Sequence, residues 1–258
     1  MLELSYHGYL SKSMNILAII PARMGSSRFP GKPLAKILGT PMIGHVYRNV
    51  SACKKLTKTI IATCDEEIIE YIESIGGEAV LTSNKHERAS DRCNEALQII
   101  ENKDRIKYDI VVMVQGDEPM TTPEMISQAI NPMLKDSSIN VVNLIGDIED
   151  KEEFNDRNTI KVVCDLNGNA MFFSREPIPT LVNTSNIPMK KQVCIIPFRR
   201  DFLIKYSSLK PTPLEVIESV DMMRVLEHGY KVKMVPTSFL TSPVDTMDDL
   251  KKVEKLMS

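Results

Sequence analysis

Apolar residues in the first half of the chain follow two alternating patterns. Short runs rich in β-branched residues predict buried strands at residues 16–20, 59–63, 78–81 and 109–114. Between and after these runs, apolar positions spaced three or four residues apart predict helices at residues 41–53, 66–75, 89–100 and 121–133. Because strands and helices alternate, we expect an α/β fold built on a doubly wound, mostly parallel sheet.

Several of these helices carry recognisable terminal signals. We expect Thr40 to be the N-cap of the first helix, with Pro41 at its first position. Asp65 is placed to cap the second helix, which Gly76 and the next glycine end. These signals set the helix boundaries and therefore the extent of the loops that connect strands to helices.

The second half of the chain predicts a different arrangement. Short strands are expected at residues 140–145, 160–164, 170–174, 192–198 and 231–236, and a turn at 165–169 predicts a hairpin. Residues 177–191 form a long excursion, a capping box predicts a helix at 213–228, and Thr246 caps a C-terminal helix. We therefore expect one domain over residues 14–258, with a smaller β-rich lobe near residues 150–200.

The composition of the chain indicates which kinds of binding partner and which cellular compartment to expect. The 258 residues are 43% hydrophobic and 26% charged with a net charge of -2, which gives no general attraction for nucleic acid or anionic membranes. Five cysteines without a C-x-x-C pair are typical of a reduced, cytoplasmic protein. No apolar run is long enough to span a membrane, and the first thirteen residues, an extension of unknown role, lack the apolar core of a signal peptide.

The loop after the first strand has the composition of a phosphate site. It contains two glycines and two serines, which allow close approach of backbone N–H groups, together with Arg23, Arg28 and Lys32. The alternative is a solvated basic loop, but two prolines restrain this one and it follows the most apolar strand. We interpret it as a cradle for a polyphosphate.

Two carboxylates are candidates for binding a metal ion beside that cradle. In a parallel sheet, ligands bind beyond the carboxyl ends of the strands, where Asp117 follows the 109–114 strand. A carboxylate that faces phosphates needs an intervening cation, typically Mg²⁺, and a second carboxylate to hold it, for which Asp245 is the candidate. The alternative for Asp117 is a turn residue before Pro119, and the alternative for Asp245 is a helix-entry residue before Thr246.

Other phosphate and hydrolase motifs do not occur in the sequence. Neither G-x-x-x-x-G-K-[ST] nor G-x-G-x-x-G is present, and no Ser-His-Asp arrangement is visible. Nucleotidyl transfer agrees best with the residues: the loop binds a nucleoside triphosphate, Mg²⁺ lies near the α-phosphate, and a substrate oxygen attacks there.

Five segments in order and register resemble the 3-deoxy-manno-octulosonate (KDO) cytidylyltransferases, the CMP-KDO synthetases. They are Pro21-Ala-Arg-Met-Gly-Ser-Ser-Arg-Phe-Pro-Gly-Lys-Pro-Leu34, Val114-Gln-Gly-Asp-Glu-Pro119, Phe173-Ser-Arg-Glu-Pro-Ile-Pro179, Pro211-Thr-Pro-Leu-Glu215 and Val244-Asp-Thr246. The resemblance spans residues 14–258 and implies a nucleotide-diphospho-sugar transferase-like fold. It also implies a CTP- and Mg²⁺-dependent enzyme that makes a CMP-sugar for lipopolysaccharide or capsule, and a homodimer with the lobe at about residues 165–200 at its interface.

The resemblance also assigns roles to residues. Arg23, Lys32, Asp117 and Asp245 would be catalytic, the two aspartates as metal ligands. The nucleotide would contact Pro21, Ala22, Arg23, Gly25, Ser26, Ser27, Arg28, Lys32, Ser90, Arg92 and Gln115. The sugar acid would contact Gln115, Arg175, Gln192, Phe198 and Asp221.

The sugar end departs from the family pattern. Gln192 stands where the family has His, Ile196 where it has Tyr, and Asp221-Met222 where it has Glu-Gln. In the segment that covers the cytosine, residues 83–92, Arg88-Ala89 replaces Ser-Gly. Polar contacts that read hydroxyls discriminate strongly between substrates, so their replacement leaves open KDO itself, an amino-substituted, deoxygenated or acylated relative, or a nonulosonate. Two further alternatives remain: another nucleotide with a sugar-1-phosphate, and a non-catalytic nucleotide-binding homologue.

Overall fold

A five-stranded sheet carries the first half of the chain. The computed structural model describes residues 14–25, 28–180 and 189–258. The strand order is β11-β6-β1-β4-β5, in which β1, β4, β5 and β6 are parallel and β11 is antiparallel to β6. Their bounds are Ile16–Pro21 (β1), Lys58–Thr63 (β4), Ala79–Leu81 (β5), Ile110–Val114 (β6) and Ile195–Arg199 (β11). The four parallel strands confirm the prediction from the apolar runs.

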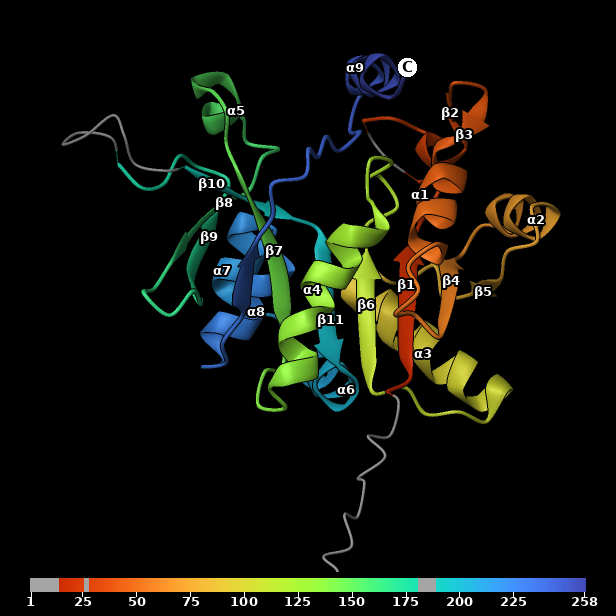
Figure 1. Ribbon diagram of the computed structural model, residues 1–258, viewed down its shortest axis with the longest axis horizontal. Coiled ribbons are helices and arrows are strands. Elements are labelled where there is room, and N and C mark those ends of the chain that lie inside the picture. The colour runs from red at the N-terminus through yellow and green to blue at the C-terminus, as the bar shows by residue number, and fades with distance from the viewer. Residues whose placement is uncertain (1–13, 26–27, 181–188) are drawn as a thin grey trace, which may run out of the picture.

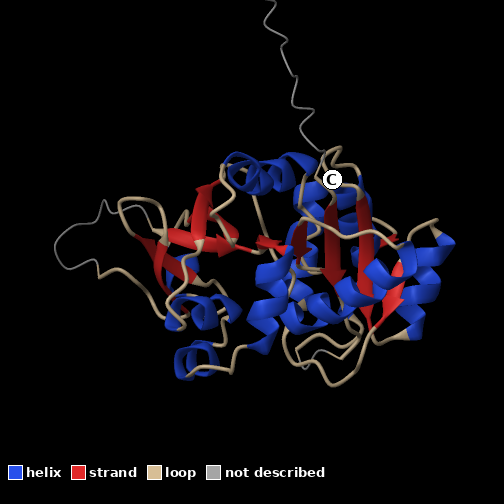
Figure 2. Ribbon diagram, turned by 90° about the horizontal axis from the view of Figure 1, so that it is seen from below, coloured by secondary structure: helices blue, strands red, loops and turns tan. Residues whose placement is uncertain are grey.

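Helices cover both faces of this sheet. Alternate residues of β1 point to opposite faces, so Ala18 packs with one group of helices and Ile19 with the other. One face is covered by α1 (Met42–Ser51), α2 (Glu66–Ser74) and α4 (Pro123–Lys135), and the other by α3 (Ala89–Asp104) and α6 (Arg200–Ser208). Figure 2 shows helices on both sides of the strands. The doubly wound arrangement is therefore confirmed.

The strand order reverses between β1 and β6. The chain moves from β1 through β4 to β5 by way of α1 and α2 on one face, then returns by way of α3 on the other face to β6. The connections leave β1 and enter β6 on opposite sides of the sheet, which opens a crevice at the carboxyl ends of these two strands. The C-terminal helix α9 (Met247–Met257) lies at the same end, beside the short strand β2 (Lys36–Ile37) that pairs with β3 (Thr40–Pro41) (Figure 1).

A second five-stranded sheet, of order β12-β7-β10-β8-β9, contains most of the remaining strands. Its strands are Val142–Asp147 (β7), Lys161–Cys164 (β8), Ala170–Ser174 (β9), Lys190–Val193 (β10) and Lys233–Pro236 (β12). The predicted hairpin is β8 and β9, which pair antiparallel. The prediction of one strand at 192–198 is wrong: the chain breaks at Cys194, because β10 pairs with β7 in the second sheet whereas β11 pairs with β6 in the first.

Two predicted helical features are also corrected. The helix expected at 213–228 is divided into α7 (Pro213–Glu218) and α8 (Asp221–Glu227), because Ser219 adopts a left-handed conformation with φ of 53°. Thr40 belongs to β3, and Pro41, which has no side-chain acceptor, is the N-cap of α1. The sequence did not predict α5 (Lys151–Asn155), α6 or the single 3₁₀ turn Lys32–Leu34. No helix in the described ranges is long and apolar enough to cross a membrane.

Candidate functional site

Three backbone N–H groups hold the loop that follows β1, two by bonds to β4 and the residue capping α2 and one by a bond within the loop. The backbone N–H of Ala22 donates to the carbonyl of Ala62 at 3.0 Å, and that of Met24 donates to Asp65 Oδ2 at 2.7 Å. The N–H of Gly31 closes the loop on the Met24 carbonyl at 3.1 Å. Asp65 is the N-cap residue of α2, as predicted, but its carboxylate restrains this loop instead of capping the helix through its side chain.

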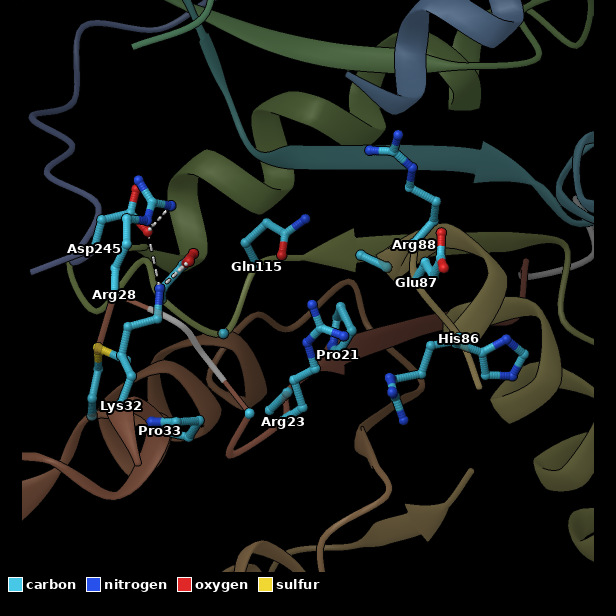
Figure 3. Close-up of a pocket in the computed structure, with 17 residues that line it drawn as sticks. Pro21, Arg23, Arg28, Lys32, Pro33, His86, Glu87, Arg88, Gln115 and Asp245 are labelled. Atoms are coloured by element: carbon cyan, nitrogen blue, oxygen red, sulfur yellow. Dashed lines mark hydrogen bonds and ion pairs between the residues drawn. The ribbon is translucent and has the colours of Figure 1, made fainter. Parts of the chain in front are cut away.

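Lys32 lies between the two candidate metal-binding carboxylates. Its Nζ is 2.7 Å from Asp117 Oδ2 and 3.2 Å from Asp245 Oδ1, and Arg28 lies 3.0 Å from the same oxygen of Asp245 (Figure 3). Burial alone would lower the pKa of Lys32, but the charges of Asp117 and Asp245 and their hydrogen bonds outweigh it and raise the pKa. The three groups thus form a charged cluster at the crevice.

Tertiary contacts bring these distant residues together. Asp117 follows β6 and Asp245 precedes α9, and the N–H of Val244 donates to the Asp117 carbonyl at 2.9 Å, which ties the two loops. Gly116 allows the close approach of the β6 loop to β1: a Cβ there would lie 3.0 Å from the Pro21 carbonyl oxygen and 3.1 Å from Ile43 Cδ1. A side chain at position 116 would push the two loops apart.

A cavity of about 340 Å³, the loop cavity, opens in front of this cluster. Its wall includes eight of the predicted nucleotide contacts: Pro21, Ala22, Arg23, Gly25, Arg28, Lys32, Arg92 and Gln115. In Figure 3, Arg28, Lys32 and Asp245 gather on one side and His86, Glu87 and Arg88 on the other. Arg23 is exposed, and among the described residues its side chain has no hydrogen-bond or ion-pair partner, so its charge is available to a ligand. Ser26 and Ser27 lie outside the described residues.

Two predicted nucleotide contacts have other neighbours as well. Ser90 is fully buried, is not part of the cavity wall, and donates its hydroxyl to Asp221 Oδ2 at 2.8 Å. Arg92 is 3% exposed and bonds Thr82, while its second terminal nitrogen has no partner in the described part of the chain. Arg92 therefore has a donor to offer, whereas Ser90 holds the start of α3 against α8.

A second cavity, the inter-sheet cavity of about 310 Å³, adjoins the first between the two sheets. Gln115, Arg175, Gln192 and Asp221 from the predicted sugar contacts line it. Arg175 Nε donates to the Glu218 carbonyl at 2.8 Å, so it fixes the break between α7 and α8. Gln192 Nε2 donates to Asn143 Oδ1 at 2.6 Å. Burial raises the pKa of Asp221, which the Ser90 hydrogen bond and the Arg88 charge partly counter.

Phe198 does not reach either cavity. It is fully buried, its ring centroid is 6.0 Å from that of Tyr206, and it pairs with Val111 in the interior of the first sheet. The family resemblance had assigned Phe198 to the sugar. Of the residues after Cys194, Ile196 lines the inter-sheet cavity, whereas Phe198 lies in the core of the first sheet.

Two residues that were not among the predicted contacts lie at these cavities. Arg88 lines both of them and lies 3.6 Å from Asp221 and 3.7 Å from Glu215. Glu118 lines the inter-sheet cavity, and burial together with the neighbouring Asp117 charge raises its pKa to about 8. The signal for Glu118 was its place directly after Asp117, but nothing in the pattern showed that it is buried.

Among the described residues, Asp117 and Asp245 remain the candidate metal ligands. No group of three or more His, Cys, Asp or Glu side chains there has the arrangement of a metal centre. The two oxygens that meet Lys32 Nζ nevertheless converge on one cationic atom, so the carboxylates already share a position for positive charge. Oxygen ligands of this kind suit Mg²⁺, which commonly takes one or two carboxylates and completes its shell with phosphate oxygens and water.

Comparisons with known proteins agree with this geometry. Residues 17–234 match the family model described as cytidylyltransferase. A 3-deoxy-manno-octulosonate cytidylyltransferase of Geobacter metallireducens is 41% identical over 95% of this chain and 98% of its own length. A 3-deoxy-manno-octulosonate cytidylyltransferase of Acaryochloris marina is 36% identical over 93% of this chain and 96% of its own length.

Solved structures give the same result. The structure of a CMP:2-keto-3-deoxy-manno-octonic acid synthetase complexed with CTP is 35% identical, with a TM-score of 0.86 over 94% of this chain and 98% of that one. A 4-diphosphocytidyl-2C-methyl-D-erythritol synthase from Anaerococcus prevotii is similar in fold, with a TM-score of 0.64 and 17% identity over 95% and 96% of the two chains.

Proposed function

The chain belongs to the cytidylyltransferase family, and on that premise we propose that it activates a 2-keto-3-deoxy sugar acid, KDO or a related acid, with CTP. The anomeric hydroxyl oxygen forms a bond to the α-phosphorus of CTP, the bond to the bridging oxygen breaks, and pyrophosphate leaves. The hydroxyl proton passes to solvent. The observation that carries the proposal is the cluster in which Lys32 joins Asp117 to Asp245 beneath the loop after β1.

Each part of the loop cavity has a task in this reaction. The exposed guanidinium of Arg23 and the ammonium of Lys32 neutralise the triphosphate, and the glycine-containing loop admits its oxygens close to the backbone. Arg92 offers its unpaired nitrogen to the base side of the cavity. Catalysis then consists mostly of positioning the α-phosphate and stabilising the charge that develops on it.

Mg²⁺ is the proposed cofactor, held by Asp117 and Asp245. The fit rests on two carboxylate oxygens that already converge on one cationic atom, at 2.7 and 3.2 Å. When bound, the ion polarises phosphoryl oxygens and neutralises charge on the leaving pyrophosphate. Asp117→Asn should abolish turnover while CTP still binds weakly, measured by pyrophosphate release and by calorimetry. Unchanged turnover would remove Asp117 from the metal site.

The acceptor is proposed to occupy the inter-sheet cavity. Gln115 lines both cavities, which supports a position for it between nucleotide and acceptor. On the acceptor side, Gln192 is engaged by Asn143 and Met222 is fully buried, so the wall offers few free polar side chains. This arrangement supports KDO or a relative with a modified hydroxyl pattern, such as an amino-substituted KDO or a nonulosonate.

A pyrophosphate-release assay tests the proposal. The enzyme with Mg²⁺ is given each nucleoside triphosphate in turn and a panel of 2-keto-3-deoxy acids, with a sugar-1-phosphate as control. We expect release with CTP and at least one acid. Release only with another nucleotide and the sugar-1-phosphate, or no release at all, would refute it, the latter in favour of a non-catalytic nucleotide-binding protein.

We also propose a homodimer, with residues 165–200 of the lobe at its interface, that acts in the cytoplasm in lipopolysaccharide or capsule synthesis. Support for a contact surface comes from exposed apolar side chains on the β8–β9 hairpin, Leu166 and Met171, the latter 63% exposed. Part of the lobe, residues 181–188, lies outside the described residues. Analytical ultracentrifugation tests this: a monomer at micromolar concentration would contradict it.

A further inference from the structure

Most polar side chains on the wall of the inter-sheet cavity already have protein partners. Arg175 donates to the Glu218 carbonyl, Gln192 to Asn143, and Lys191 to Glu153. Asp221 accepts from Ser90, and Asp117 from Lys32. A ligand in this cavity would therefore have to find hydrogen bonds among the few groups that remain.

Glu118 is one of those groups, and it is the most deeply buried. It is 5% exposed, it lines the cavity, and its Oε2 has no hydrogen-bond partner among the described residues. Its backbone is fully used, since its N–H donates to the Gln115 carbonyl at 3.3 Å and its carbonyl accepts from Thr121 at 3.0 Å. Only the carboxyl group is left for a ligand.

An unpaired buried acceptor is costly to the protein, so a donor that reaches it gains more than it would at the surface. Both signs of charge line this cavity, since Lys191 and Arg175 accompany Asp117 and Asp245. The wall therefore selects no ionic group, and a sugar hydroxyl is a neutral donor of the kind that Glu118 can bind.

We propose that the carboxyl group of Glu118 accepts a hydrogen bond from one hydroxyl of the acceptor acid and so contributes to acceptor specificity. This inference rests on the proposed function, because it presumes a polyhydroxylated acid in the inter-sheet cavity. Glu118 then supplies a hydroxyl contact in a cavity where Gln192 is engaged by Asn143 and Ile196 is apolar.

The experiment compares Glu118→Met, Glu118→Gln and wild type under steady-state conditions with CTP, Mg²⁺ and the best acid from the panel. Methionine keeps the length of the side chain and removes the acceptor, and we expect the KM for the acid to rise about 10- to 100-fold. The KM for CTP and the Mg²⁺ concentration for half activation should stay within about twofold. Glutamine keeps an acceptor oxygen and should restore most of the affinity. Glu176→Gln, a matched change at an exposed carboxylate that pairs with Arg157, should change nothing.

A series of monodeoxygenated acids identifies the hydroxyl. For one member, wild type and Glu118→Met should have the same KM, because the bond is missing in both. If Glu118→Met does not fold, the series is run with wild type and Glu118→Gln. The ratio of KM in the two proteins should then be the same for every deoxy acid except the one that lacks this hydroxyl, because only this hydroxyl contacts the group that differs.

Three results would overturn the inference. They are a change confined to the KM for CTP or to the Mg²⁺ requirement, a penalty equal for every deoxy acid, and an unchanged KM for the acid in Glu118→Met. Failure of the proposed function is a separate result, since it shows as absence of wild-type pyrophosphate release with CTP and every acid.

Discussion

Replacing Lys32 with methionine removes one charge and little volume from the centre of the site. In the wild type the ammonium of Lys32 bonds Asp117 at 2.7 Å and Asp245 at 3.2 Å, and its side chain is 12% exposed. Arg28 remains 3.0 Å from Asp245 in the variant, so Asp117 alone loses its cation. The change therefore isolates the interaction between Lys32 and Asp117.

The size of the effect follows from these contacts. A hydrogen bond to a charged group contributes about 1.5–3 kcal/mol, and the Asp117 side chain is 29% exposed, so water compensates part of its loss. We expect Lys32→Met to lower the free energy of unfolding by about 2 kcal/mol. For a chain of this length that corresponds to a fall in Tm of about 4–8 °C.

The pH dependence has a definite sign. The pKa of Lys32 is raised in the folded protein, so its stabilisation is complete below the ordinary lysine pKa of 10.5 and is lost as pH rises through the raised value. As far as Lys32 is concerned, the difference in Tm between wild type and variant should therefore be constant between pH 7 and 9 and shrink in stronger alkali.

The assay is thermal denaturation with and without MgCl₂, in the absence of CTP. In the nucleotide-free wild type the ammonium occupies the position between the carboxylates, whereas in Lys32→Met that position is open to a divalent cation. Magnesium should therefore raise the Tm of the variant more than that of the wild type. Lys36→Met, at an exposed lysine in β2, is the matched control and should behave as wild type. Equal stability of wild type and Lys32→Met, or a larger magnesium shift in the wild type, would refute the reasoning.

Two further predictions concern the packing around Gly116 and the ion pair between Glu101 and Arg200, which lies away from the site. Gly116→Ala places a Cβ 3.0 Å from the Pro21 carbonyl oxygen, so we expect a loss of about 1–3 kcal/mol in urea denaturation together with a higher KM for CTP; a variant as stable and active as wild type would contradict the close approach. Burial would raise the pKa of Glu101, but two hydrogen bonds of 2.7 Å from Arg200 outweigh it and lower that pKa. The stabilisation that ionised Glu101 contributes is present above its ordinary pKa of 4.5 and is lost as pH falls through the lowered pKa. Glu101→Gln should therefore lower the free energy of unfolding by about 2 kcal/mol at pH 7 and by much less near pH 3. An equal loss at both pH values would refute this.

Local sequence determined the elements of the first sheet. The runs that became β1 and β6 are apolar throughout, and β4 is buried at every position after Lys58, because both faces of these strands are covered by helices. The glycines, prolines and cations of the loop after β1 likewise indicated phosphate chemistry before any contact was known. Short-range pattern was sufficient here because burial on both faces leaves a periodic signal.

The second half depended on pairing partners that are far apart in sequence. Cys194 lies in a continuous apolar stretch, and nothing local shows that the residues before it pair with β7 while those after it pair with β6. Beyond this crossing, Ile196 lines the inter-sheet cavity and Phe198 is buried in the core of the first sheet. Strand pairing is settled by contacts over long sequence separations, which local pattern does not contain.

The residue types alone indicated that cations and carboxylates belong to one site. How these groups pair with one another was known only from the fold. The sequence by itself determined the alternation of strands and helices, and it indicated a phosphate-binding loop and two candidate metal ligands at one edge of the sheet. Only the tertiary structure decided that Lys32 joins Asp117 to Asp245, that Ser90 bonds Asp221, and that Oε2 of Glu118 is buried without a partner among the described residues. The reason is physical: burial and pairing depend on which segments meet, and the bonded residues here are 85 to 213 positions apart in the chain.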